Sequence, residues 1–274
     1  MTTKNLAARL EKAGPIAAAD IDEAREKWAD WRSAYGRKRD GSAPLLTDPG
    51  GNVKIAKASL PSYSLALAAG KYGRFNVCPA AGMCEKSCLG KTAGRNVMVN
   101  AQSAQAMRTD FLAASPAHFL AVLADEIRRA VCARRRAVGP YARIGVRLNA
   151  YSDIAWERVA PWLFAEFSDS VQFYDYTKRD ARSRRSVPNY HLTFSADERM
   201  TREQLLAHLD AGRNVAVVGK RRKGEPLPMS SVPIIDGDRT DSRWTDPAGV
   251  VVHLARKGNA LDVGSPFLRD DLLA

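Results

Sequence analysis

The sequence contains few of the features that mark membrane, secreted or disulfide-linked proteins. It has no run of about 18 apolar residues, so no transmembrane helix is expected. Its first residues, MTTKNLAARLEKAG, lack the apolar stretch of a secretory signal. Only four cysteines occur in 274 residues, whereas secreted disulfide scaffolds are shorter and richer in cysteine. These absences predict a cytoplasmic protein without disulfides and without a membrane partner.

The motifs of several common enzyme classes are missing as well. The chain has no Walker loop, no Gly-x-Gly-x-x-Gly, no His-Glu-x-x-His and no Gly-x-Ser-x-Gly. The zinc-deaminase signature is absent too, although cysteine and proline are adjacent at Cys78-Pro79. The sequence therefore predicts none of the enzymes that depend on these motifs.

Positive charge is abundant and clustered along the chain. Lys and Arg number 42 against 30 Asp and Glu, which gives a formal net charge of +12. An excess of this size makes nucleic acid or a nucleotide the expected partner. Arg-rich surfaces also occur in proteins of GC-rich genomes, and this is the alternative explanation. The basic clusters are Arg37-Lys38-Arg39, Arg128-Arg129, Arg134-Arg135-Arg136, Arg182 with Arg184-Arg185, and Lys220-Arg221-Arg222-Lys223.

The N-terminal part is expected to be helical. Apolar residues, among them Trp28, recur at helical spacing over residues 15–35, with charged residues between them. The following residues 37–51 are basic and then rich in Gly, Pro and Asp, which is typical of a linker. We therefore divide the chain into an N-terminal helix and linker, residues 1–50, and a single α/β domain, residues 51–274.

Strand-like and helical patterns alternate in the second half of the chain. Strands that alternate with helices argue for βαβ units and a parallel sheet. With 45% hydrophobic residues, the chain can also bury a sizeable core. A (β/α) barrel or partial barrel is the first expectation, and a doubly wound open sheet is the second. The strands are expected at residues 52–58, 144–148, 171–176, 191–194, 215–218, 233–235 and 250–254, and the helices at 96–112, 116–136, 154–167 and 201–209.

Three of the four cysteines lie in one glycine-interrupted loop, residues 75–95. Cys78, Cys84 and Cys88 follow a Cys-x5-Cys-x3-Cys spacing, and thiolates this close repel one another unless a cation neutralises them. Three cysteines suit a cubane iron–sulfur cluster that leaves one iron open for a small ligand. The spacing differs from the Cys-x3-Cys-x2-Cys of radical S-adenosylmethionine enzymes, so direct membership of that class is not predicted.

Two alternatives to an iron–sulfur cluster remain open. A structural zinc needs a fourth ligand, for which Cys132 or His253 is the candidate, and the usual paired Cys-x2-Cys knuckles are absent. Three unbound thiols are less favoured, because exposed thiols beside lysines oxidise readily. The cysteines therefore predict a metal centre, with iron–sulfur preferred over zinc.

Polar side chains follow most of the predicted strands. In parallel α/β folds the carboxyl ends of strands meet at one edge, where chemistry gathers. We therefore expect one polar pocket facing the cysteine loop, with acid–base, substrate-orienting or cation-binding roles. A buried Asp175 needs a cation such as Lys178 or an arginine. Helix capping by Ser152-Asp153 and Asx-turns at Asp236 and Asp238 are the local alternatives. The candidates are Asn149, Asp153, Asp175, Lys178, Asp236, Asp238 and Lys257.

Five blocks of the sequence carry a further signal. They are Asn76-Val-Cys-Pro-Ala-Ala-Gly-Met-Cys-Glu-Lys-Ser-Cys-Leu-Gly, Arg147-Leu-Asn149 with Ser152-Asp153 and Trp156-Glu157, Phe173-Tyr-Asp-Tyr-Thr-Lys178, Asp236-Gly-Asp238 with Asp241 and Asp246, and Ala255-Arg-Lys257-Gly258. Over residues 59–267 these blocks resemble a family of phage, prophage and plasmid proteins, related to a phage family catalogued as a numbered gene product. The resemblance implies a mobile-element origin and brings no particular activity.

Two functions follow from these observations. The first is an iron–sulfur enzyme of a mobile element that acts on nucleic acid or a nucleotide, with the strand-end residues around the cluster. The second is a non-catalytic nucleic-acid-binding protein, used in replication or regulation of the element, in which zinc or a cluster only stabilises the loop. Inhibition of a host enzyme is a third function, and no feature of the sequence favours it.

Overall fold

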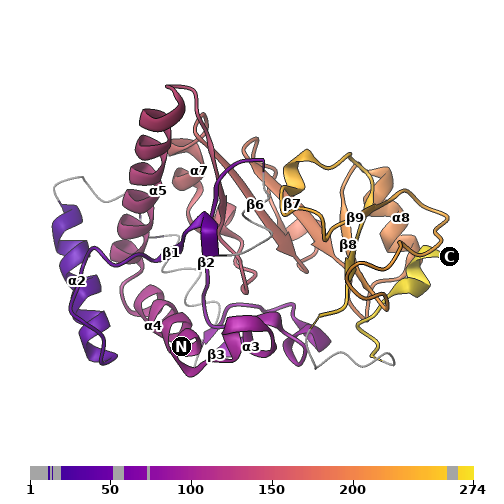
Figure 1. The fold of residues 1–274 in the computed structure, drawn as a ribbon, viewed down its shortest axis with the longest axis horizontal. Coiled ribbons are helices and arrows are strands. Elements are labelled where there is room, and N and C mark those ends of the chain that lie inside the picture. The colour runs from indigo at the N-terminus through magenta and orange to yellow at the C-terminus, as the bar shows by residue number, and fades with distance from the viewer. Residues whose placement is uncertain (1–11, 13, 15–19, 52–58, 73–74, 258–264) are drawn as a thin grey trace.

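The computed structural model describes residues 12, 14, 20–51, 59–72, 75–257 and 265–274. Its centre is an eight-stranded sheet with the strand order β1-β2-β5-β6-β7-β8-β10-β9 (Figure 1). Neighbouring strands are parallel except for β1 with β2. The strands are Leu46–Thr47 (β1), Ser62–Leu65 (β2), Ile144–Arg147 (β5), Val171–Thr177 (β6), Tyr190–Ser195 (β7), Val215–Gly219 (β8), Ile234–Asp236 (β9) and Val251–Ala255 (β10). A short hairpin, Lys71–Tyr72 (β3) with Phe75–Asn76 (β4), follows β2.

Three helices, Pro116–Val138 (α5), Pro161–Glu166 (α7) and Arg202–Asp210 (α8), bury their apolar sides against one face of this sheet. Val146 and Phe173, partners in the register of β5 and β6, face the core that α5 and α7 close. Phe194 and Val215, partners in β7 and β8, face α8 in a second cluster. None of the described helices combines the length and apolar character needed to span a membrane. The helices are Ile21–Ala34 (α2), Leu89–Thr92 (α3), Val99–Ala114 (α4), Pro116–Val138 (α5), Trp156–Val159 (α6), Pro161–Glu166 (α7) and Arg202–Asp210 (α8).

The spatial order of the strands nearly follows the sequence. β2, β5, β6, β7 and β8 are neighbours in chain order, and only β9 and β10 are exchanged at the far edge. This order lacks the reversal found among the strands of doubly wound sheets. Because β1 and β9 are edges in the described part of the chain, closure into a barrel is not observed. The mixed α/β fold with a mostly parallel sheet is confirmed.

Local signals in the sequence set several helix boundaries. Pro116 occupies the first turn of α5, where its missing N–H costs nothing. At α8, Thr201 and Gln204 form a capping box. The single helix expected over residues 154–167 is instead divided into α6 and α7. Pro161 causes the division, because it has no N–H to donate and restricts the backbone of the residue before it.

β2 is a central strand that the sequence pattern does not predict. Its residues alternate Ser and larger side chains, and Ser62 is fully buried between β1 and β5. Gly145 is its partner on β5, and a Cβ at Gly145 would overlap the Ser62 hydroxyl. The strand expected at residues 52–58 and the first part of the expected helix, residues 15–19, lie outside the described residues.

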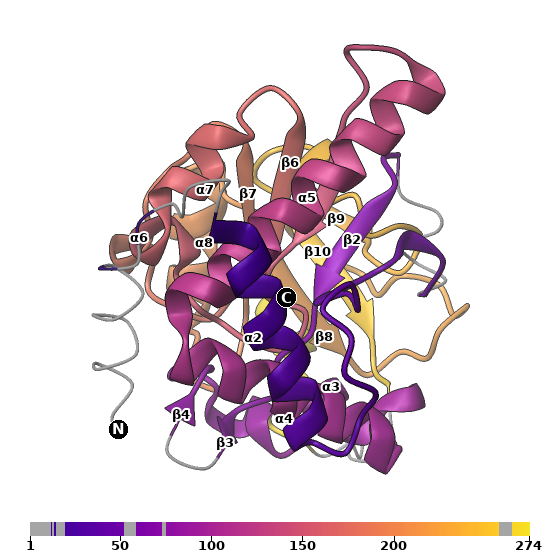
Figure 2. The same cartoon turned by 90° about the vertical axis from the view of Figure 1, so that its left-hand side faces the viewer.

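α2 shares the main core of the protein. Figure 2 shows α2 lying across the outer side of α5. Its Trp28 is fully buried, stacks on Phe111 with ring centroids 5.2 Å apart, and donates its indole N–H to the Ala43 carbonyl at 2.6 Å. Arg25 lies 2.6 Å from the Asp125 carboxylate on α5. Aromatic packing and an ion pair therefore join this N-terminal helix to the sheet-covering layer.

Trp28→Ala should lower the free energy of unfolding by about 3–5 kcal/mol, because a large buried ring and its stacking partner are lost. Denaturant unfolding followed by circular dichroism measures the change. Glu26→Ala is the control, since that side chain is 74% exposed on the same helix, and it should leave stability nearly unchanged. Equal effects of the two substitutions would contradict the assignment of α2 to the main core.

Candidate functional site

The cysteine loop, residues 75–95, contains α3 and lies at the carboxyl edge of the sheet (Figure 1). Contacts to two other segments hold it there. The Asp153 N–H donates to the Val77 carbonyl at 2.7 Å, and the Met83 N–H donates to Glu198 Oε1 at 3.1 Å. Asp153 follows β5 and Glu198 follows β7. The loop therefore bridges the ends of strands that are far apart in the sequence.

The three thiols of this loop are electrostatic neighbours. Cys78, Cys84 and Cys88 are partly buried and form no disulfide, and Cys78 Sγ donates to the Tyr151 carbonyl at 3.2 Å. Burial raises the pKa of the Cys78 thiol to about 12, and the nearby Cys88 and Cys84 sulfurs act in the same direction. Burial also raises the pKa of Cys84 and Cys88, whereas Lys178 opposes the rise. Holding all three as thiolates therefore requires a cation.

The described residues contain no closed metal-binding set. No three Cys, His, Asp or Glu side chains among them are arranged as ligands of one ion. Cys132 is exposed on α5, and His253 is hydrogen-bonded between Arg221 and Asp270. Neither candidate for a fourth ligand is thus among the described neighbours of the three thiols. Metal binding would require the cysteine side chains to turn toward one another.

Asn149 and Asp175 form a buried pair beside the loop. Asp175 Oδ1 accepts from the Asn149 backbone N–H at 2.7 Å, and Oδ2 accepts from Asn149 Nδ2 at 3.3 Å and the Tyr190 hydroxyl at 2.7 Å. Burial raises the pKa of Asp175 to about 7, although the Tyr190 hydrogen bond opposes the shift. Asn149 Oδ1 accepts from Ser152 at 2.8 Å and from the Trp156 indole at 3.0 Å. The pair thereby shapes the turn after β5.

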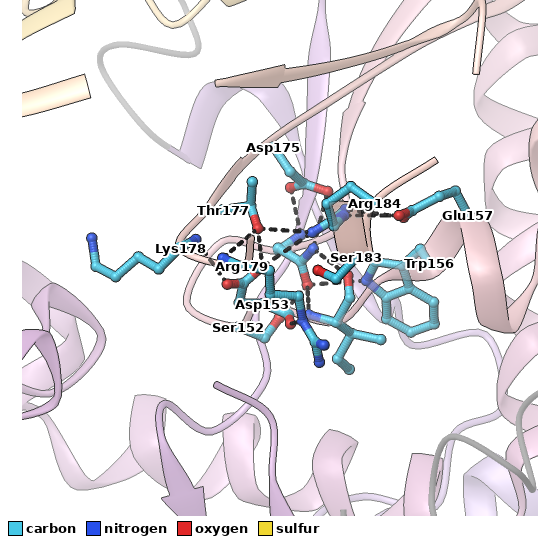
Figure 3. Close-up of polar contacts among 12 residues, drawn as sticks. Ser152, Asp153, Trp156, Glu157, Asp175, Thr177, Lys178, Arg179, Ser183 and Arg184 are labelled. Atoms are coloured by element: carbon cyan, nitrogen blue, oxygen red, sulfur yellow. Dashed lines mark hydrogen bonds and ion pairs between the residues drawn. The ribbon is translucent and has the colours of Figure 1, made fainter. Parts of the chain in front are cut away.

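A buried arginine neutralises the next two carboxylates (Figure 3). The Arg184 side chain is 2% exposed and binds both Glu157 oxygens, at 2.8 and 3.0 Å. Its third nitrogen contacts Asp153 Oδ1 at 3.2 Å. Asp153 also accepts from the Thr177 hydroxyl at 2.8 Å and from the Lys178 backbone N–H at 2.9 Å. Asn149, Asp153 and Asp175 thus belong to one network with satisfied polar groups.

Lys178 extends its side chain away from this network (Figure 3). Its Nζ donates to Ser195 Oγ, at the end of the neighbouring strand β7, at 2.5 Å. The same Nζ lies 5.1 Å from the centroid of the Phe267 ring. Lys178 opposes the rise in the pKa of Cys84 and, together with Lys91, that of Cys88. The cations that act on Asp175 are Arg147 and Arg184, so the arginine alternative of the prediction is the one found. Lys178 therefore connects the first network with the cysteine loop.

The other candidates belong to a second network around β8, β9 and β10. Arg221 Nη2 lies 2.5 Å from Asp236 Oδ1 and 3.2 Å from Asp238 Oδ2. Lys257 Nζ lies 2.8 Å from Asp238 Oδ1. Arg221 also donates to His253 Nδ1 at 2.9 Å. The single pocket expected from the sequence is thus replaced by two networks on different strands.

Residues 265–274 complete the second network. Asp270 Oδ1 lies 2.9 Å from His253 Nε2, and Leu272 is buried in the cluster that includes β8 and α8. Gly219 makes this close approach feasible, because a Cβ there would overlap both His253 and Asp270. Both ring nitrogens of His253 are therefore hydrogen-bonded within the protein, and the side chain stabilises this end of the sheet.

Comparison with known proteins shows one family match, which covers the first network and all of the second except Asp270. The family model described as gene product 88 matches residues 39–269. The chain belongs to the gene product 88 family. No curated protein and no solved structure matches it. The resemblance to a numbered gene-product family is thus confirmed, consistent with a phage origin, and the match begins after α2.

The sequence does not predict the roles of two central residues of this gene product 88 protein. Arg184 and Arg221 are predicted only as members of basic clusters, although each is buried among carboxylates. Their neighbours Arg182 and Arg222 are exposed, so the clusters mix two environments. The acidic residues at the strand ends are the sequence feature that could have predicted these two buried arginines, since buried carboxylates require buried cations. Tyr190, which donates to Asp175, has no such signal.

Arg184→Met should destabilise the protein by about 3–5 kcal/mol, because Glu157 and Asp153 would remain buried without their cation. Arg182→Met is the matched control: that side chain is 92% exposed and pairs with Asp180, which is itself exposed, so little change is expected. Denaturant unfolding of both variants provides the comparison. A stable Arg184→Met protein would mean that water solvates the two carboxylates.

Asp175 should give stability a specific pH dependence. Its pKa is about 7 in the folded protein and about 3.9 in the unfolded chain. The folded state therefore binds the proton more tightly, and the free energy of unfolding should fall as pH rises from about 4 to about 7, then level off. In Asp175→Asn this decline should be shallower, by up to about 1.4 kcal/mol per pH unit. Parallel stability curves for the two proteins would refute the raised pKa.

Proposed function

We propose that the protein is an iron–sulfur enzyme of a mobile element, acting on nucleic acid or a nucleotide in the host cytoplasm. One observation carries this proposal: three cysteine thiols gather at the carboxyl edge of a mostly parallel sheet, beside Lys178 and Asp153. That edge is where α/β enzymes assemble their active sites, because loops from several strands converge there.

The chemistry of the donor set suits an iron–sulfur cluster, which the three side chains could bind once they turn toward one another. Cys78, Cys84 and Cys88 supply three soft sulfur ligands, and a bound cationic centre offsets the cost that burial places on their thiolates. A cubane cluster with three protein ligands keeps one iron open for a small ligand, whereas structural zinc demands a fourth protein ligand. When bound, the cluster would supply electron transfer or activation of a ligand at that open iron.

The chain's own side chains take complementary roles in this proposal. Lys178, which reaches toward the cysteine loop, attracts an anionic group of the substrate. Asn149, Asp153 and Asp175 orient the loop, and Asp175 also holds a proton that titrates near neutral pH. On the neighbouring strands, Asp236, Asp238 and Lys257 hold a further polar part of the substrate or a cation. This last set completes the site only if the substrate spans both networks.

A second function rests on the charge of the protein. The formal net charge of +12 favours binding to a polyanion whether or not chemistry follows. In this alternative the protein is a non-catalytic nucleic-acid-binding factor of replication or regulation. The cysteine loop then holds zinc or a cluster only to stabilise the edge of the sheet.

Metal analysis tests the iron–sulfur part of the proposal. Protein purified without oxygen should be brown and contain about four iron and about four sulfide per chain. Cys78→Ser, Cys84→Ser or Cys88→Ser should each lower the iron content, and Cys132→Ser, an exposed residue on α5, should not. A colourless protein with one zinc per chain would contradict the iron–sulfur enzyme and support the structural alternative.

A further inference from the structure

A basic surface lies at the opposite end of the molecule from the cysteine loop. The C-terminal end of α5 stands beyond the sheet in both views (Figures 1 and 2). Arg134, Arg135 and Arg136 lie on its last turns, and Tyr141 and Arg143 lie in the segment that leads to β5. We call these five residues the α5 basic end. β5 starts immediately afterwards, so this surface is at the amino edge of the sheet.

The charges of the α5 basic end are not neutralised within the described chain. Arg128 and Arg129, earlier on the same helix, contact Glu166 at 2.5 Å and Asp125 at 2.9 Å. The four arginines of the basic end form no ion pair among the described residues. The helix C-terminus contributes only about half a negative elementary charge. Arg136 is exposed and the other three arginines are partly exposed, so an external anion can reach this charge.

Tyr141 adds a recognition element other than charge. Its side chain is 92% exposed at the tip of the turn between α5 and β5. An exposed aromatic ring among arginines stacks on the unpaired bases of a single strand, whereas a duplex keeps its bases stacked internally. Binding to a membrane surface would instead require a broad apolar face. Among the described residues, Val138, 59% exposed, is the one large exposed aliphatic side chain next to Tyr141, so such a face is not found here.

We propose that the α5 basic end binds single-stranded nucleic acid, with its arginines on the phosphates and Tyr141 stacked on a base. The inference rests on the nucleic-acid part of the proposed function and is independent of the cluster. Because the surface lies at the amino edge, it holds the strand away from the cysteine loop. Binding and any chemistry are thereby assigned to opposite edges of one sheet.

Fluorescence anisotropy with labelled oligothymidylate and oligouridylate tests this surface at several salt concentrations. Arg134→Gln with Arg136→Gln should weaken binding about tenfold at low salt and make the slope of log affinity against log salt shallower by about 1.4. Tyr141→Ala should lose about fivefold or more on a single strand without changing that slope, and Tyr141→Phe should retain wild-type affinity. The oligonucleotide that binds more tightly identifies DNA or RNA as the natural class.

Arg222→Gln with Lys223→Gln is the charge-matched control, since both residues are exposed in the loop after β8, and affinity should stay within about twofold. Equal weakening by the two double variants would overturn the inference, as would binding to phosphatidylserine vesicles in preference to either oligonucleotide. Cys78→Ser protein should bind as well as wild type. Wild-type protein that binds the oligonucleotides but contains no iron would leave this inference intact and contradict only the iron–sulfur enzyme.

Discussion

The buried Arg184 guanidinium is the interaction on which the carboxyl edge of the sheet depends. It neutralises Glu157 and Asp153 in a place that water does not reach, where an unpaired charge costs several kcal/mol. Asp153 links this ion-pair network to two other segments of the chain. Its carboxylate fixes Thr177 at the end of β6, and its N–H holds Val77 of the cysteine loop. The position of the thiols is therefore a consequence of charge compensation in the core.

Elements with local signals could be predicted from the sequence. Pro116 and the capping box at Thr201 act within one turn of their helices, so α5 and α8 begin close to where the pattern places them. The apolar runs of β5, β6, β8 and β10 are visible because both faces of these strands are covered. β2 has no such run. Its burial depends on Gly145 of β5, a strand that is its neighbour in the sheet but lies about 80 residues later in the sequence. Packing between strands that are far apart in the chain leaves no pattern in a short stretch of sequence.

The candidate site shows the same limit. The rule that parallel strands present polar residues at one edge correctly brought Asn149, Asp153 and Asp175 into one network. It failed for Asp236 because β9 lies outside β10, so its carboxylate meets Arg221 on another part of the sheet. Arg184 and Arg221 could not be separated from their exposed neighbours, since burial of an arginine follows from tertiary placement of its acidic partners.

Residues 265–274 come later in the chain than every strand they hold together. Asp270 encloses His253 of β10, and Leu272 fills the cluster beside β8. During synthesis, β5, β6 and β7 with the Arg184 network leave the ribosome early enough to pack first. β8 and β10 come next, and the contacts of Asp270 with His253 and of Leu272 with the cluster beside β8 can form only after residues 265–274 have been made.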